Sequence, residues 1–247
     1  MTRDWVMFYY ANPRPERFTE EVRREAREGR LSESDSALPL IVFLSQVMAA
    51  NAPKVRSWLS ALADLDLSAR KPLLMAAWLS ATSAGKEACQ ASGEVSFSTP
   101  PPDFLSLDVD QPVMLDALWH FYFATGDPRA IKRIATVFEY MGDVGTASSF
   151  RDSPRTDADA AAALRDAMFQ AASWSFESLM RQHRPLKALC GELVRIGQLS
   201  ANARVSLAMI LAKIDPDVWQ VDIDTESRHA EISWRGRAHS KDRGPRS

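Results

Sequence analysis

An acidic and a basic side chain interrupt one otherwise apolar stretch of the sequence, one helical turn apart. The stretch is PVMLDALWHFYFA, residues 112–124, and the interruptions are Asp116 and His120. Side chains four residues apart share a helix face, so the carboxylate could orient the imidazole for general acid and base chemistry. Buried polar groups also need hydrogen-bond partners, so the two could instead bond each other or a neighbouring helix. We favour this structural role and retain both residues as candidate catalytic residues.

Three further side chains complete a candidate binding site around this pair. Trp119 precedes His120 directly, while Lys132 and Arg133 lie on the helix expected next, where they could extend the polar network. If the pair lines a groove rather than a core, these five residues are the expected binding residues.

The helix that holds the pair is apolar nearly all round, which is typical of a buried helix rather than of a surface helix with one polar face. Asp110 is the expected N-cap before Pro112, and the turn at residues 125–128 ends the helix. We therefore expect this helix to be the central one of the domain.

The sequence lacks the common motifs of cofactor and metal chemistry. It contains no Gly-rich phosphate loop, no GxSxG nucleophile elbow, no HExxH and no paired CxxC. The four histidines, at positions 120, 183, 229 and 239, are never four residues apart, which argues against a metal site built from histidines. We expect neither a cofactor nor a metal.

Composition predicts a globular domain without a membrane span. The 247 residues are 46% apolar and carry a net charge of −2, which suits a single sizeable core. No apolar run approaches the about 18 residues that a membrane-spanning helix needs. The apolar patch at residues 5–10 is too short for the core of a signal peptide, so we expect a cytoplasmic protein. Cys89 and Cys190 are then expected as two buried thiols rather than as a disulfide.

Apolar periodicity and helix-breaking residues predict an all-α body. The expected helices cover residues 15–29, 38–50, 53–65, 69–85, 112–124, 128–140, 157–182, 185–196 and 201–214, and the segments between 92 and 112 and between 142 and 154 are expected loops. Ser68 is the expected N-cap of the helix that begins at residue 69. In the first helix Phe18, Val22 and Ala26 form the expected buried stripe. We expect its charged residues, Glu21, Arg24, Glu25 and Glu28, to face solvent.

Short turns between successive helices predict stacked antiparallel hairpins. Pro53, Pro128 and Pro185 each begin a helix after a short polar turn, although their spacing is not periodic. The hairpin at residues 115–141 resembles a tetratricopeptide unit, because Tyr122 precedes the turn by the interval typical of that family. It departs from the family at Trp119, where a small residue is usual, and at Ala130, which lies one place early. The resemblance implies an irregular α-solenoid that binds protein or peptide segments; without it, we expect an irregular helical bundle.

The C-terminal part has a different pattern. VWQVDID, residues 218–224, alternates apolar and polar side chains, and HAEISW follows at 229–234, which predicts a small β-hairpin. We expect residues 1–214 to form one helical domain, 215–234 a C-terminal extension and 235–247 a disordered basic tail. Because no aromatic residue follows Trp234, we do not expect the tail to bind nucleic acid.

Two functions fit these patterns. The first is a non-catalytic helical scaffold that binds a protein or peptide partner. The second is an enzyme that uses Asp116 and His120 as an acid/base pair, with a substrate that enters beside the loop at residues 92–111. The sequence does not predict the oligomeric state.

Overall fold

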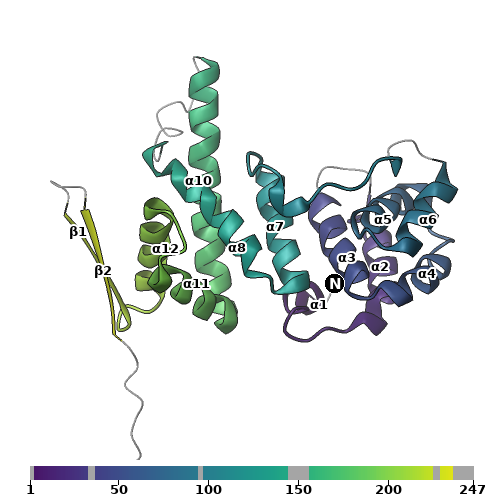
Figure 1. Cartoon of the computed structure of the whole chain (residues 1–247), viewed down its shortest axis with the longest axis horizontal. Helices are drawn as coiled ribbons and strands as arrows, with labels where there is room; N and C mark the ends of the chain where they lie inside the picture. Colours follow the sequence, from purple (N-terminus) through teal and green to yellow (C-terminus); the bar gives the residue numbers. More distant parts are fainter. Residues whose placement is uncertain (1–2, 33–36, 94–96, 144–155, 225–228, 236–247) are drawn as a thin grey trace, which may run out of the picture. The chain divides into compact units, whose positions relative to one another are not determined.

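The fold is helical, with one small sheet near the C-terminal end (Figure 1). The computed structural model describes residues 3–32, 37–93, 97–143, 156–224 and 229–235. The first elements, with η for a 3₁₀ helix, are α1 (Arg3–Met7), η1 (Pro15–Arg17), α2 (Phe18–Arg27), α3 (Leu38–Ala50), α4 (Ala52–Ala61), α5 (Leu67–Leu79), α6 (Ser83–Ser92), η4 (Phe104–Ser106), α7 (Pro112–Thr125) and α8 (Pro128–Ala135). They are followed by η5 (Thr136–Asp143), α10 (Asp157–Gln182), α11 (Arg184–Ile196), α12 (Ala201–Ile214), β1 (Trp219–Asp224) and β2 (His229–Trp234). The predicted all-α fold class and C-terminal hairpin are confirmed.

The chain divides into two compact units, Met1–Ile134 and Ala135–Ser247. The boundary falls inside residues 1–214, the range that the sequence predicts as one helical domain. Of the predicted basic tail, residues 236–247 lie outside the described part of the chain. Among the described helices, none combines the length and the hydropathy that a membrane crossing requires.

Packing of α3 against α7 forms the core of the first unit. Both helices are apolar at nearly every position, so each is buried on most sides. Trp5 and Tyr9 pack edge-on against Phe43 of α3, with ring centroids 5.1 and 5.6 Å from that ring. The prediction of a buried helix over residues 112–124 is confirmed.

Two helices begin at different caps from those predicted. The N-cap of α7 is Gln111 rather than Asp110, because a proline at the first helical position holds the residue directly before it in an extended conformation. The N-cap of α5 is Asp66 rather than Ser68. The carboxylate of Asp66 accepts the N–H of Ala69 at 2.9 Å and also the hydroxyl of Ser68 at 2.7 Å. The capping function therefore falls on the acidic side chain, two residues before the predicted one.

Two of the four charged residues of α2 that were predicted to face solvent, Glu21 and Glu25, are buried instead, whereas Glu28 is exposed as predicted. The side chains of Glu21 and Glu25 are 0% exposed. Arg17 and Arg24 both form ion pairs with Glu21. Arg30, beyond the end of the helix, donates to both carboxylate oxygens of Glu25, at 2.6 and 3.1 Å. Arginines on the same segment thus balance the charges, and this allows carboxylates to be buried.

We expect the Arg30–Glu25 pair to contribute far more to stability than an exposed pair of similar geometry. In Arg30→Met the Glu25 carboxylate stays buried without its cation, which should lower the free energy of unfolding by about 2–3 kcal/mol. The control is Arg23, whose guanidinium bonds the exposed carboxylate of Asp64 at 2.8 and 2.9 Å. Arg23→Met should cost less than about 1 kcal/mol. Urea titration measures both values, and equal losses would contradict the importance of the buried pair.

The second unit is built on α10, which packs against α11, α12 and η5. Phe138 of η5 contacts two rings of α10, with centroids 5.4 Å from Phe169 and 5.5 Å from Phe176. The helix expected over residues 128–140 changes at Ala135 from α to 3₁₀ winding. At 26 residues α10 is much longer than the 14-residue α12, and its N-terminal half extends past the other helices of this unit (Figure 1).

The hairpin packs against α12, and one of its tryptophans also contacts α11. Trp219 of β1 is buried, and its ring lies over α11 where Gly191 leaves space for it. A Cβ atom at position 191 would lie 3.1 Å from the ring. The guanidinium carbon of Arg195 lies 5.8 Å from the ring centroid, and Trp234 of β2 lies directly opposite in the register, with its centroid 6.0 Å away.

A larger side chain at position 191 should therefore displace the hairpin. We expect Gly191→Val to lower the free energy of unfolding by about 1–3 kcal/mol through overpacking. It should also shift tryptophan fluorescence to the red as Trp219 becomes solvated. Ala188→Val on the exposed side of the same helix is the control, and it should leave the spectrum unchanged. An unchanged spectrum in Gly191→Val would show that the ring does not depend on this space.

Each unit contains one cysteine, and both cysteines are buried without a disulfide between them, as the sequence predicts. The Cys89 thiol donates to the carbonyl of Leu74 at 3.4 Å. Burial raises the pKa of the Cys190 thiol far above its ordinary value, so this sulfur stays protonated and unreactive while the unit is folded.

Candidate functional site

The predicted pair on α7 shares a face, but the two side chains do not bond each other. Nδ1 of His120 lies 2.8 Å from the backbone carbonyl oxygen of Asp116, and as a donor it satisfies an oxygen of its own helix. The Asp116 side chain is exposed, whereas the imidazole is half-buried and lies edge-on to Phe123 with centroids 6.0 Å apart. The carboxylate therefore does not orient the imidazole in the way that an acid/base pair requires.

The apolar surroundings shift the pKa values of both residues toward their neutral forms. Burial lowers the pKa of His120 below its ordinary 6.5, against the opposing effects of the Asp116 carbonyl and carboxylate. Desolvation raises the pKa of Asp116 above its ordinary 3.8, against the effect of the His120 charge. At neutral pH the imidazole is uncharged, and with Nδ1 as donor its Nε2 is an acceptor.

The other three predicted binding residues have different environments in the structure. Trp119 is only 3% exposed, and its ring stacks on Phe123 with centroids 6.2 Å apart, so it belongs to the core. Arg133 on α8 donates to the carbonyl of Leu107 at 2.5 Å and so holds the segment before α7. Lys132 is half-buried on α8.

The first unit contains a pocket beneath the predicted loop at residues 92–111, with a volume of about 190 Å³. Its lining includes Ser45 and Gln46 of α3, Phe121 of α7, and Asp103 and Phe104 of the loop. A second, mainly apolar pocket of the same volume lies among α4, α5 and α6. Neither pocket is lined by Asp116 or His120. Phe121 of α7 and residues 102–105 of the predicted loop line the first pocket, so the loop and α7 do meet at a pocket, as the second function predicted from the sequence requires.

The second unit exposes an apolar seam along α10 that sequence reasoning missed. The seam consists of Ala160, Leu164, Ala167, Ala171 and Trp174, all exposed, with Trp174 at 74%. Its spacing alternates four and three residues, which is the pattern of a helix that packs against another helix. The opposite stripe of α10, which includes Met168, Ala172, Phe176 and Met180, is buried in the unit. The seam is visible in the sequence, but nothing there tells which of the two apolar stripes faces the core.

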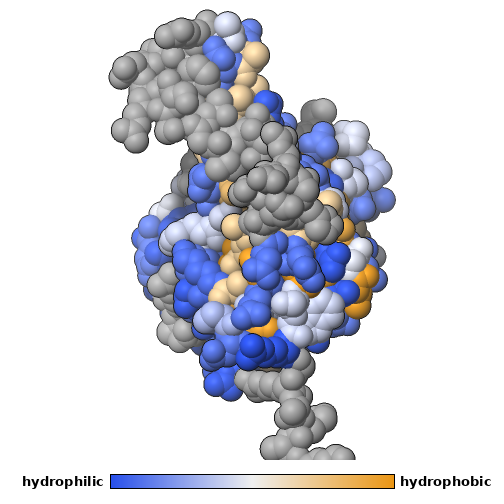
Figure 2. All heavy atoms as spheres, turned by 90° about the vertical axis from the view of Figure 1, so that its left-hand side faces the viewer, coloured by the Kyte–Doolittle hydropathy of each residue, from blue (hydrophilic) through white to orange (hydrophobic). Residues whose placement is uncertain are grey.

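Figure 2 shows one face of the second unit, on which hydrophilic residues predominate. Pale orange apolar residues appear among them at the upper end of the view, where α10 protrudes. In the described part of the chain, no group of three His, Cys, Asp or Glu side chains is placed to hold a metal ion.

Comparison with known proteins identifies no relative: no family model, no curated protein and no solved structure matches the chain. The tetratricopeptide resemblance of residues 115–141 therefore stays a prediction.

The burial of His120 should make stability depend on pH. The unfolded imidazole titrates near 6.5 and the folded one lower, so the unfolded state binds more protons between these values, and stability should fall as pH drops through this window. Burial lowers the pKa of His183 as well, so His183 also contributes a loss of stability as the pH drops. We expect His120→Gln to lose less stability than the wild type between about pH 7 and 5. Asp116→Asn, the control, should keep the carbonyl bond and most of this pH dependence.

Urea titrations across this pH range measure the effect. Identical pH dependence in the wild type and in His120→Gln would mean that His120 titrates in the folded protein as it does in water.

Proposed function

We propose that this protein is a non-catalytic helical scaffold that binds a protein partner, and that the exposed seam of α10 receives an α-helix of that partner. The seam is the observation that supports this proposal. A run of exposed apolar residues on a regular helix is unusual, because such a surface is normally covered by another element.

The spacing of the seam suits a helix rather than an extended peptide. Alternating steps of four and three residues keep side chains on one line along a helix, and a partner helix with the same spacing can interdigitate with them. Three of the five seam residues are alanines, which let two helix backbones approach closely. Leu164 and Trp174 are the large side chains available to fill spaces on the partner.

Trp174 should dominate the binding energy. Tryptophan is among the residues that most often account for the affinity of interfaces, because it buries a large area and loses little conformational entropy. At 74% exposure, about three quarters of the surface of Trp174 remains available for burial. Close to Trp174 along α10, Glu177 pairs with Arg181 at 2.9 Å and with Lys213 of α12 at 2.6 Å. Two cations and one anion leave a local surplus of positive charge, which favours an acidic residue on the partner helix.

The alternative function, an enzyme that uses Asp116 and His120, receives less support. Its imidazole bonds a backbone carbonyl rather than the carboxylate, and neither described pocket of the first unit includes the pair. Polar side chains that bond their own helix in this way usually have a structural role.

Site-specific photocrosslinking tests the scaffold proposal. A photoreactive phenylalanine analogue at position 164 or 174 should form a covalent adduct with one protein of the native host. The crosslinked residues of that protein should recur at three- and four-residue steps along one helix. The same analogue at position 67 is the control, because Leu67 is an exposed apolar residue of the first unit.

Variants measure the contribution of the seam once the partner is purified. Trp174→Ser should weaken binding at least tenfold, which is about 1.4 kcal/mol, without lowering the melting temperature. Leu67→Ser should change neither. Unaltered binding in Trp174→Ser, or crosslinks from position 67 alone, would overturn the proposal.

A further inference from the structure

The outer edge of β2 is the side of this strand that faces away from β1. In the part of the chain that the structure describes, the sheet has two strands, so each strand has one edge that pairs with no other. Two-stranded sheets are marginally stable alone, and open edges readily accept a further strand.

The hydrogen-bond pattern defines which backbone groups point to that edge. The N–H of Arg235 donates to the carbonyl of Val218 at 2.9 Å, so these opposed residues form a hydrogen-bonded pair. Such pairs alternate with non-bonded ones in an antiparallel ladder. The N–H and C=O groups of Ile232 and Trp234 therefore point away from β1, whereas those of Ser233 point toward it.

β2 packs less against the helices of its unit than β1 does. The packing of the hairpin on α12 is made mainly by β1, whose Trp219 is buried. On β2, Ile232 and Ala230 are half-buried and Trp234 is 42% exposed. Part of the apolar face of the hairpin thus lies uncovered beside an edge that can form hydrogen bonds.

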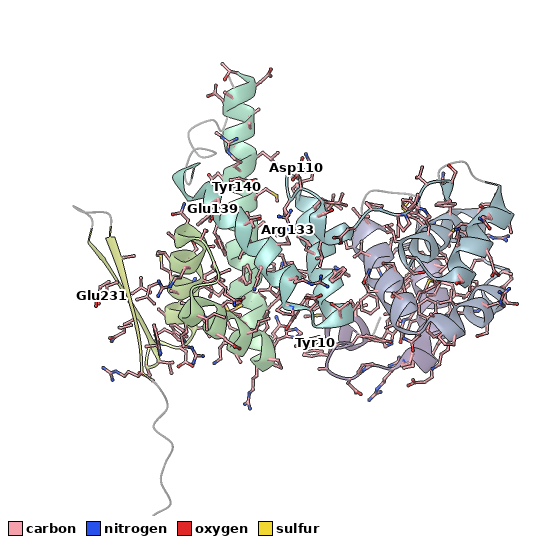
Figure 3. All side chains as sticks on the ribbon, viewed as in Figure 1. Tyr10, Asp110, Arg133, Glu139, Tyr140 and Glu231 are labelled. Carbon is pink, nitrogen blue, oxygen red and sulfur yellow. The ribbon has the colours of Figure 1, made fainter. Side chains whose placement is uncertain are left out.

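A like-charge contact on the other face of the hairpin also lacks compensation within the described residues. Asp222 and Glu231 are directly opposed in the register, and such pairs are destabilising. Both side chains are exposed, and Glu231 projects away from the helices of its unit (Figure 3). A cation on the free side of Glu231 would offset the repulsion.

We propose that β2 pairs antiparallel with β2 of a second copy of this chain, with the two-fold axis at Ser233, to form a four-stranded sheet. In this register Ile232 of each copy faces Trp234 of the other, and the outward N–H and C=O groups of both residues form four hydrogen bonds. Glu231 of each copy faces Arg235 of the other, which supplies the missing cation twice. Shifting the axis to Glu231 would instead oppose two glutamates.

The ring of Trp234 gains an apolar neighbour in this arrangement, because Ile232 of the other copy lies on the same face of the sheet. The paired segment is only five residues long, residues 231–235, so the interface is small and the dimer should be weak and dependent on concentration.

Charge reversal provides the test. Sedimentation of the wild type over a concentration series should show a shift from the 27.5 kDa monomer toward the dimer. Glu231→Arg and Arg235→Glu should each remain monomeric, because like charges then face each other across the two-fold axis. The double variant should regain the dimer, and an equimolar mixture of the two single variants should form a heterodimer.

Three controls separate this result from misfolding and from the proposed function. Glu231→Arg places a cation opposite Asp222, so its own hairpin should be strengthened, and the exciton signal of the opposed tryptophans in circular dichroism reports that the hairpin is intact. Trp174→Ser on α10 should leave the dimer unchanged. A wild type that stays monomeric at about 0.5 mM, where a dimer with a dissociation constant of about 0.1 mM would be mostly formed, would overturn the proposal. So would single variants that dimerise like the wild type, or a mixture that forms no heterodimer.

Discussion

Mutual burial of two helices that are apolar on almost every side is the constraint on which the first unit depends. Neither α3 nor α7 has a polar face to turn toward water, so each must be covered by the other and by neighbouring elements. Aromatic rings from other segments complete the cover, for example Trp5 on α3 and Phe104, which stacks on Phe121 of α7 with centroids 6.0 Å apart. The short helices and loops of this unit serve to cover α3 and α7.

The same constraint explains the polar side chains on these two helices. Ser45 donates to the carbonyl of Val42 at 2.7 Å, and Thr125 donates to that of Phe121 at 2.8 Å. His120 makes the equivalent bond to the carbonyl of Asp116. Each of these side chains forms its hydrogen bond with a backbone carbonyl of its own helix, so it needs no hydrogen-bond partner from elsewhere in the core. His120 therefore resembles its hydroxyl neighbours more than it resembles a catalytic histidine.

Periodicity predicts the presence and length of several elements: α3, α10 and α12 have the bounds that apolar spacing and helix-breaking residues predict. It fails where two faces of one helix compete for burial. Glu21 and Glu25 of α2 are buried because they form ion pairs with Arg17, Arg24 and Arg30. A prediction from the spacing of apolar residues assigns every charged residue to the surface and therefore misses this burial. In α10 both stripes are apolar, and only the packing against η5 and α12 selects the one that is buried.

The same limit applies to the candidate site. Spacing correctly places Asp116 and His120 on one face of a helix, but it contains no information on whether Nδ1 meets a carboxylate or a carbonyl. Residues from distant segments meet at the pocket under the loop, where Ser45 and Asp103 are far apart in the sequence. Only the fold brings them together.

The placement of one buried thiol in each unit has an experimental consequence. A protonated, enclosed sulfur reacts with an alkylating reagent only when its surroundings open, so the labelling rate at Cys89 reports the opening of the first unit and the rate at Cys190 that of the second. The two rates can be read separately by peptide mass spectrometry from one unmodified sample. The chain thus carries its own pair of probes for whether its halves unfold together or one before the other.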